Sequence, residues 1–241
     1  MHVYSQPINM PLTDVEIREA VSLWCNSPAQ ATSKYGRIGD WDTSEVTDMS
    51  ELFRYQITFN ENICGWDVSS VLNMRGMFRD ALVFNQALSG WDVSSVTDMG
   101  EMFRGATLFN QDLSGWDVSS VTDMHRMFNR ATVFNQDVSG WNVSKVMVMR
   151  NMFYSATSFN QALSGWDVSG VADMGGLFRR ASVFNQDLSG WDVSTVTHMC
   201  HMFDRATAFN NNLSGWDVSG VIDMSYMFNR ARAFNQDLSG W

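Results

Sequence analysis

Apolar residues recur along this chain with a fixed period of 25. Tryptophan stands at 41, 66, 91, 116, 141, 166, 191, 216 and 241, and methionine, phenylalanine and alanine follow each tryptophan at constant offsets. A period in this range is typical of a solenoid, in which each unit buries its apolar face only by stacking on its neighbours. The sequence therefore predicts a distinct first unit over 1–40. A solenoid over 41–241 follows, with eight complete repeats and the first residue of a ninth.

Two apolar rhythms alternate within each repeat. In the repeat that starts at Trp116, the alternation of Trp116 and Val118 indicates a short strand. The later apolar positions step by three or four, which indicates a short helix or 3₁₀ turns. One strand and one helical side per repeat suit a right-handed coil with parallel strands. We therefore predict an α/β solenoid with one short parallel strand and one short helical segment in every repeat.

The first 40 residues lack the repeat and predict a helical cap. Thr13 and Glu16 have the spacing of a capping box, in which each side chain bonds the other residue's backbone N–H. One apolar helix face follows, formed by Ile17, Ala20, Val21 and Trp24. Pro28 ends the helix because proline cannot continue it. Such a helix would cover the exposed end of the solenoid.

Four columns of invariant or nearly invariant residues are expected to have structural roles. Methionine fills position nine of every repeat and position twelve of six, with Leu52 and Leu177 in the other two. Methionine rows can form an adaptable binding surface or a soft-metal site, but helical spacing and replacement by leucine favour a core. The tryptophan row is also interpreted as core rather than as an aromatic platform. An asparagine stands at position 20 of every repeat, where its side chain is expected to bond the backbone of the turn and of the stacked neighbour.

A column of aspartates after the tryptophans is the candidate cation site. If stacked strands lie about 4.8 Å apart, these like charges repel and need an offset. The serine two residues later, or backbone N–H groups, could hydrogen-bond each carboxylate; alternatively Ca²⁺ could bridge successive carboxylates. The residue after the tryptophan is an aspartate in every complete repeat, beginning with Asp42, except in one repeat, where it is Asn142. The metal hypothesis therefore names Asp67, Asp92, Asp117, Asp167, Asp192 and Asp217. A second acidic column, at position eight, is interpreted as residues at a helix start.

The positions that vary most from repeat to repeat predict the partner surface. They fall on the expected helical side and point outward, whereas the outward positions of the expected strand are nearly uniform. A solvated face explains such variation, and a protein partner is the alternative. The candidate partner face consists of Glu101, Arg126, Asn151, Arg179, His201 and Tyr226.

Charge and composition restrict the classes of partner. The net charge of −10 and the pI near 4.7 argue against nucleic acid and against an anionic membrane surface. No apolar run reaches the roughly 18–20 residues of a membrane span, and the start of the chain lacks the pattern of a secretory signal. The three cysteines do not form a disulfide framework, although Cys25 and Cys64 could meet if the cap packs on the first repeat.

No catalytic constellation is recognisable, so we expect a protein that is not an enzyme and holds no organic cofactor. Nucleophile-elbow, phosphate-loop and zinc-protease motifs are missing from the sequence. His198, Cys200 and His201 form a compact group, but they occur in one repeat only, whereas a zinc site needs three or four fixed ligands.

The sequence pattern of the repeats resembles known repeats; its segments are, in order, WDVSSVTDM, MF, A and FNQDLSG. The series looks like the leucine-rich repeats of BspA-like bacterial surface proteins and, more closely, the 25-residue repeat of unknown function in mycoplasma-type lipoproteins. The resemblance covers 41–241 and implies a leucine-rich-repeat-like solenoid with a cell-surface or extracellular role, without defined catalytic residues. It favours a protein-interaction or adhesion module. A structural or linker subunit that associates end to end is the alternative, because the ninth repeat leaves an unpaired strand edge.

Overall fold

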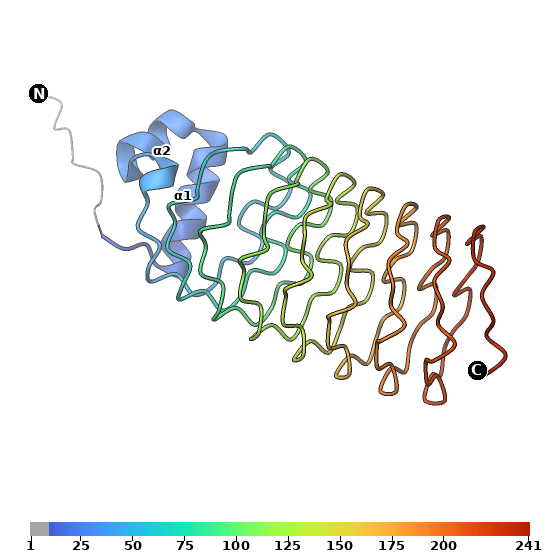
Figure 1. Ribbon diagram of the computed structural model, residues 1–241. Coiled ribbons are helices and arrows are strands. Elements are labelled where there is room, and N and C mark those ends of the chain that lie inside the picture. The colour runs from blue at the N-terminus through green and yellow to red at the C-terminus, as the bar shows by residue number, and fades with distance from the viewer. Residues whose placement is uncertain (1–9) are drawn as a thin grey trace, which may run out of the picture.

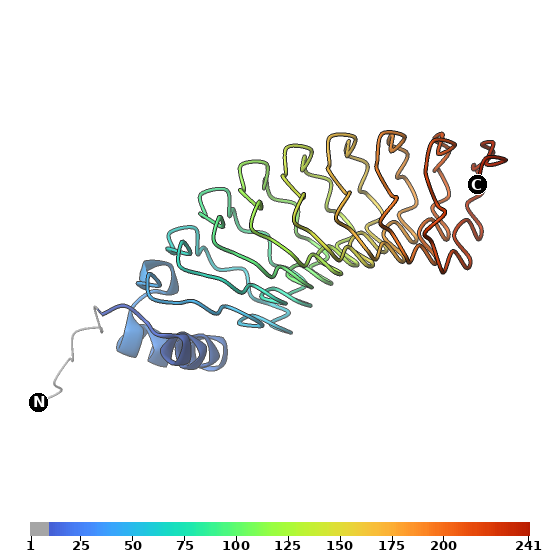
Figure 2. The same ribbon diagram turned by 90° about the horizontal axis from the view of Figure 1, so that it is seen from below.

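The chain forms a row of stacked coils with helices at one end (Figure 1). The structure, a computed structural model, describes residues 10–241. The helices are α1 (Asp14–Asn26), α2 (Pro28–Tyr35) and the short 3₁₀ helix η1 (Ile38–Asp40). From Trp41 onward each 25-residue repeat makes one coil, and positions within a coil are counted here from its tryptophan. The orientation of the coils changes progressively along the row, so the stack is twisted (Figure 2).

The prediction of an α/β solenoid is wrong. Within residues 10–241 the repeats contain no helix and no strand, and only isolated parallel bridges join position 8 of neighbouring coils. The expectation of a leucine-rich-repeat fold fails with it, because that fold needs a strand in every repeat. The chain therefore stacks its repeats without a β-sheet.

Successive turns replace the expected helical segment. In the fourth coil the N–H groups of Met127, Asn129 and Ala131 each donate to the carbonyl three residues earlier, at 3.0–3.2 Å. However, Arg126 and Arg130 have φ angles of 53° and 61°. These left-handed residues interrupt the right-handed path at every fourth position, so a helix cannot continue. The apolar spacing of three or four residues is produced by consecutive turns and not by a helix.

The remaining N–H groups of this segment join one coil to the next. Met124, Arg126 and Phe128 donate to the carbonyls of Val148, Arg150 and Met152 at 2.9–3.1 Å, and Arg130 completes the set at 2.7 Å. The equivalent four bonds connect every neighbouring pair of coils from the first to the eighth. All of them run in one direction, from positions 9, 11, 13 and 15 of one coil to the following coil. A parallel β-strand instead donates and accepts alternately, which is why this ladder is not a sheet.

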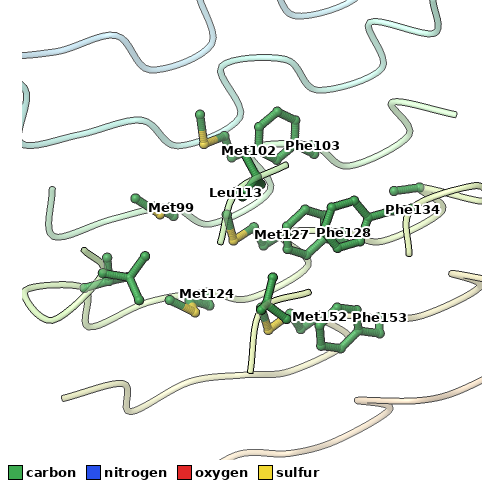
Figure 3. Close-up of a cluster of buried hydrophobic side chains, with 14 of the residues drawn as sticks. Met99, Met102, Phe103, Leu113, Met124, Met127, Phe128, Phe134, Met152 and Phe153 are labelled. Atoms are coloured by element: carbon green, nitrogen blue, oxygen red, sulfur yellow. The ribbon is translucent and has the colours of Figure 1, made fainter. Parts of the chain in front are cut away.

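Side chains in the interior form continuous columns along the stack (Figure 3). The ring centroid of Phe128 lies 3.9 Å from that of Phe134 in the same coil and 5.6 and 5.7 Å from Phe103 and Phe153 in the neighbouring coils. Met124 is fully buried, like its equivalents in the inner coils. The assignment of the methionine column to the core is therefore confirmed.

The tryptophan column also belongs to the interior. Trp116 is 3% exposed, and its indole Nε1 donates to the carbonyl of Leu88 at 3.0 Å. The tryptophans of all the remaining coils, from the second to the eighth, make equivalent bonds. The indole therefore buries an apolar surface while its only donor is satisfied.

Asparagines at position 20 form a hydrogen-bonded ladder. The Oδ1 atom of Asn110 accepts the backbone N–H of Asn135, whose own Oδ1 accepts the N–H of Asn160, both at 2.9 Å. The side chain of Gln161 donates to the carbonyl of Asn135 as well, at 2.9 Å. The predicted structural role of this column is confirmed, since each amide bonds the backbone of the stacked neighbour.

Helix α1 packs on the first coil. The predicted capping box of Thr13 and Glu16 is present, and Ile17, Ala20 and Val21 are buried. The carboxylate of Asp14 accepts the N–H groups of Thr47 and Asp48 at 2.8 and 3.0 Å. Cys25 and Cys64, which could have met if the cap packs on the first repeat, are both free thiols.

Candidate functional site

One edge of the stack carries the side chains that differ most between coils. We call positions 10, 11, 14 and 15 the variable edge. Positions 9, 12, 13 and 16 of the same segment are buried in the inner coils, so the turns direct the intervening side chains away from the core. The left-handed residues at positions 11 and 15 belong to this edge, and their backbone N–H groups join the ladder between coils. The edge therefore presents changing side chains on a fixed backbone.

The structure places all of the predicted partner-face residues on the variable edge, but not all of them point into solvent. Tyr226 is 66% exposed, whereas Glu101 is only 5% exposed. The others are half-buried: Arg126, Asn151, Arg179 and His201. The expectation of a helical, fully outward surface is therefore corrected: this edge is formed by turns, and part of it is a network of ion pairs.

Glu101 is the centre of the first ion-pair network. Its carboxylate lies 2.8 Å from a guanidinium nitrogen of Arg79 and of Arg104, and 3.3 Å from Arg126. His125 Nε2 lies 3.5 Å from the same carboxylate. Burial opposes ionisation, but the hydrogen bond and charge of Arg104 and the charge of Arg79 prevail, so the pKa of Glu101 falls to about 2. Guanidinium groups from three consecutive coils thus share one ionised carboxylate.

Asp204 is the centre of a second network, four coils further along. It is 1% exposed, and its carboxylate lies 2.9 Å from Arg179 Nε and 3.9 Å from Arg205 Nε. Asn229 Nδ2 donates to Oδ1 of Asp204 at 2.9 Å. The ring of His201 also contacts this carboxylate, at 3.3 Å. Because the partners again come from successive coils, the network ties the variable edge together along the stack.

Arginine is concentrated on the variable edge, a feature that the sequence-based interpretation missed. Eleven of the twelve arginines between 41 and 241 stand at positions 10, 11, 14 or 15, and Arg232 is the exception. Tabulating the repeats column by column would have revealed this signal. An acidic protein thus carries a basic edge.

The aspartates of the candidate cation column are bonded within their own turns. In Asp92, Oδ1 accepts the N–H and the hydroxyl of Ser94 at 3.1 and 2.7 Å, and these bonds lower the pKa of the carboxyl. The negative charges of Asp117 and Asp67 act in the opposite direction. Asn142, the natural exception, makes the same two bonds with Ser144.

The side chains of this column are exposed, and each of them turns one oxygen toward its serine. The same hydrogen bond from the serine backbone N–H to the carboxylate is found at every residue of the candidate cation site: Asp67, Asp92, Asp117, Asp167, Asp192 and Asp217. Between residues 10 and 241 no three His, Cys, Asp or Glu side chains come together as a metal site would need. His198, Cys200 and His201 likewise do not converge: His198 contacts Thr197, and His201 contacts Asp204.

The prediction that the acidic column at position 8 marks a helix start is wrong, because the repeats within residues 10–241 contain no helix. Asp98 Oδ1 accepts the N–H of Gly100 at 2.8 Å, and Asp123 and Asp173 bond the residue two places later in the same way. These carboxylates therefore stabilise the first turn of the segment that carries the variable edge.

Comparison with known proteins identifies a family. Residues 25–141, 86–175 and 123–241 each match the family model described as "Mycoplasma protein of unknown function, DUF285". The three matches together extend from 25 to 241. A search of curated proteins finds no match. Across residues 10–241, no helix has the length and apolar character needed to cross a bilayer.

Proposed function

Since the chain belongs to this family of Mycoplasma-type repeat proteins, whose function is unknown, we propose that it is a non-enzymatic scaffold for protein interaction that binds through the variable edge. The observation that carries the proposal is the contrast between the columns. The core columns repeat almost without change, while position 11 alone holds Glu51, Gly76, Arg126, Tyr226 and other residues. Side chains that differ from coil to coil can recognise a partner whose surface is irregular.

The rigidity of the variable edge supports the same function. The backbone N–H groups of Arg126 and Arg130 are fixed by bonds of 2.9 and 2.7 Å to the following coil. Glu101 and Asp204 hold several neighbouring side chains in place. A preorganised surface loses less conformational entropy on binding, so a partner can be held by few strong contacts.

A comparative capture experiment tests this proposal. The full chain is immobilised and exposed to extracts of the source cells, beside a variable-edge variant (R126S, Y226S) and an acidic-column variant (D92N, D192N). A specific partner should bind the wild type and the acidic-column variant but not the variable-edge variant. Equal capture by all three proteins, or loss only in the acidic-column variant, would contradict a role for the variable edge.

A structural role through end-to-end association is the second candidate, and the direction of the ladder between coils favours it. Positions 9, 11, 13 and 15 of one coil donate to the following coil throughout the stack. Each coil therefore has a donor face and an acceptor face that complement each other, which is the geometry that end-to-end association would use. Sedimentation velocity at rising protein concentration tests this role, and a strictly monomeric species throughout would exclude it.

A further inference from the structure

Arginines form a nearly continuous line along the variable edge. Seven of the eight coils supply at least one arginine at position 14 or 15. The coil without one has Tyr154, whose ring lies 5.6 and 5.9 Å from the guanidinium groups of Arg179 and Arg180. We call this line the arginine stripe; it consists of Arg54, Arg79, Arg104, Arg130, Arg179, Arg180, Arg205 and Arg230. Its presence in a chain of net charge −10 calls for a physical explanation.

The stripe already binds carboxylates within the chain. Arg79 and Arg104 both contact Glu101 at 2.8 Å, and Arg179 contacts Asp204 at 2.9 Å. Guanidinium groups match the geometry of carboxylates and hold them through charge-assisted hydrogen bonds. The structure therefore shows which anion this surface accepts: a carboxylate shared by arginines of neighbouring coils.

Three arginines of the stripe have no such partner. Arg130, Arg180 and Arg230 stand at position 15 of alternate coils and are exposed. Among the residues described, none of the three has a carboxylate within ion-pair distance. Their backbones are in the left-handed region, at φ angles of 59–61°. The fourth, sixth and eighth coils of the stripe thus each offer a positive charge that no carboxylate among the described residues neutralises.

We propose that the arginine stripe binds an extended acidic segment of a partner polypeptide, which lies along the stack with its carboxylates toward Arg130, Arg180 and Arg230. This inference rests on the proposed function and specifies the chemistry of the partner. The ring centroids of Phe128 and Phe153, in neighbouring coils, lie 5.7 Å apart. The unpaired arginines stand in alternate coils and are therefore about 11 Å apart, against roughly 13 Å for every fourth side chain of an extended chain, a difference that long arginine side chains can absorb.

The twist of the stack favours a flexible chain as the partner. The orientation of the coils changes along the row, so the edge that carries the stripe also turns (Figure 2). A rigid surface, including the acidic column of a second copy, would meet only a few coils of a twisted edge. An extended segment can follow the twist and reach all three unpaired arginines.

Direct binding of a defined peptide tests the inference. The probe is a fluorescent peptide of about 12 residues with glutamate at every second position, long enough to pass Arg130, Arg180 and Arg230. A peptide with glutamine in place of glutamate is the control. We expect the purified full chain to bind the glutamate peptide, as measured by fluorescence anisotropy, and to release it as salt is raised because exposed charges are screened.

The chain provides its own pattern for the variants. Ser155 stands at position 15 of the fifth coil, so R130S/R180S/R230S replaces each unpaired arginine by a residue that this position accepts. The matched control D167N/D192N/D217N copies Asn142 in the acidic column. We expect the arginine variant to bind at least about tenfold more weakly and the aspartate variant to bind as tightly as the wild type or more tightly. Unchanged melting temperatures would show that both variants fold.

Three outcomes would overturn the inference. The wild type could fail to bind the glutamate peptide at low salt, or the arginine variant could bind it equally well. The third outcome is that sedimentation detects salt-sensitive self-association of the wild type, which the arginine variant lacks, as the only use of the stripe. If the peptide fails to bind while the variable edge still captures a cellular protein, the inference is wrong and the proposed function stands.

Discussion

The guanidinium of Arg18 donates to the carbonyl oxygen of Ser50 at 2.7 Å. In the second coil the equivalent carbonyl, that of Arg75, accepts the backbone N–H of Glu51 from the preceding coil at 2.8 Å. A side chain of α1 thus takes the place of a backbone donor that the first coil lacks. Asp14 does the reverse, because its carboxylate replaces a missing backbone acceptor. The helix therefore provides both hydrogen-bonding polarities that the coil ladder needs at this end.

Removing this contact should destabilise the first coil. R18A leaves the carbonyls of Asp48 and Ser50 without the guanidinium. We expect the free energy of unfolding to fall by about 1–2 kcal/mol, and by no more, because water can replace part of the lost hydrogen bonding at this partly exposed site. Urea unfolding followed by tryptophan fluorescence measures the loss. R37A is the control, since Arg37 is exposed. Equal stability of the two variants would show that α1 covers the coil by apolar packing alone.

Glu101 should contribute stability that depends on pH. E101Q leaves the guanidinium groups of Arg79, Arg104 and Arg126 without their shared carboxylate, and we expect a loss of about 2 kcal/mol at pH 7. E51Q is the matched control at the same position of the first coil, where the glutamate is exposed and, within residues 10–241, pairs with Arg54 alone. That control should change the free energy of unfolding by less than about 0.5 kcal/mol.

The sign of the pH effect follows from the pKa of Glu101. That pKa is lowered in the folded protein, from an ordinary 4.5 to about 2. The stability is therefore complete above pH 4.5 or so and is lost as the pH falls toward 2. Unfolding of wild type and E101Q should converge over this range. A difference that remains constant between pH 7 and pH 2.5 would mean that packing rather than charge is responsible.

The asparagine ladder gives a third prediction. N135A removes the acceptor for the N–H of Asn160 and should cost about 1–3 kcal/mol, because that donor is left without a partner. N235A is the control, since the Oδ1 atom of Asn235 accepts no hydrogen bond from residues 10–241. Chemical denaturation of both variants is the measurement. If N235A is as destabilised as N135A, the effect comes from the local turn and not from the ladder.

Much of this architecture can be predicted from the sequence, but its backbone cannot. The period, the buried columns and the capping box of Thr13 and Glu16 each depend on local or strictly repeated signals. The path between Met124 and Ala131 does not, because its apolar spacing is shared by a helix and by consecutive turns. The left-handed positions are occupied by Arg126 and Arg130, which ordinarily avoid this conformation.

The backbone is decided by bonds between coils, which no single repeat contains. The N–H of Arg126 satisfies its hydrogen bond only when the next coil lies beside it. The one local signal is glycine at the same positions in other coils, as at Gly76, Gly105 and Gly176, all with positive φ angles. The ion-pair network around Glu101 was missed for the same reason, since its members come from three repeats.

The left-handed backbone at position 15 gives a fourth prediction. Ser155 has a φ angle of 56°, so S155G should relieve a strain of about 1 kcal/mol, partly offset by the greater freedom of glycine in the unfolded chain. We expect a net gain of up to about 0.5 kcal/mol. S158G, at an exposed residue without positive φ, should instead lose about 0.5–1 kcal/mol. Thermal unfolding distinguishes the signs, and a loss in both variants would show that position 15 carries no strain.

The acidic column gives the last prediction, which concerns calcium. The column pairs each carboxylate with a serine of its own turn, as Asp192 does with Ser194 at 2.7 Å. Ca²⁺ takes six to eight oxygen ligands, and a line of carboxylates with one oxygen already bonded provides few of them. The melting temperature in millimolar Ca²⁺ should therefore stay within about 1 °C of its value in EDTA, because a ligand stabilises only the state that binds it. A rise of many degrees that D167N/D192N/D217N abolishes would instead place cations on the column, in which case neighbouring aspartates would be drawn together by a shared ion.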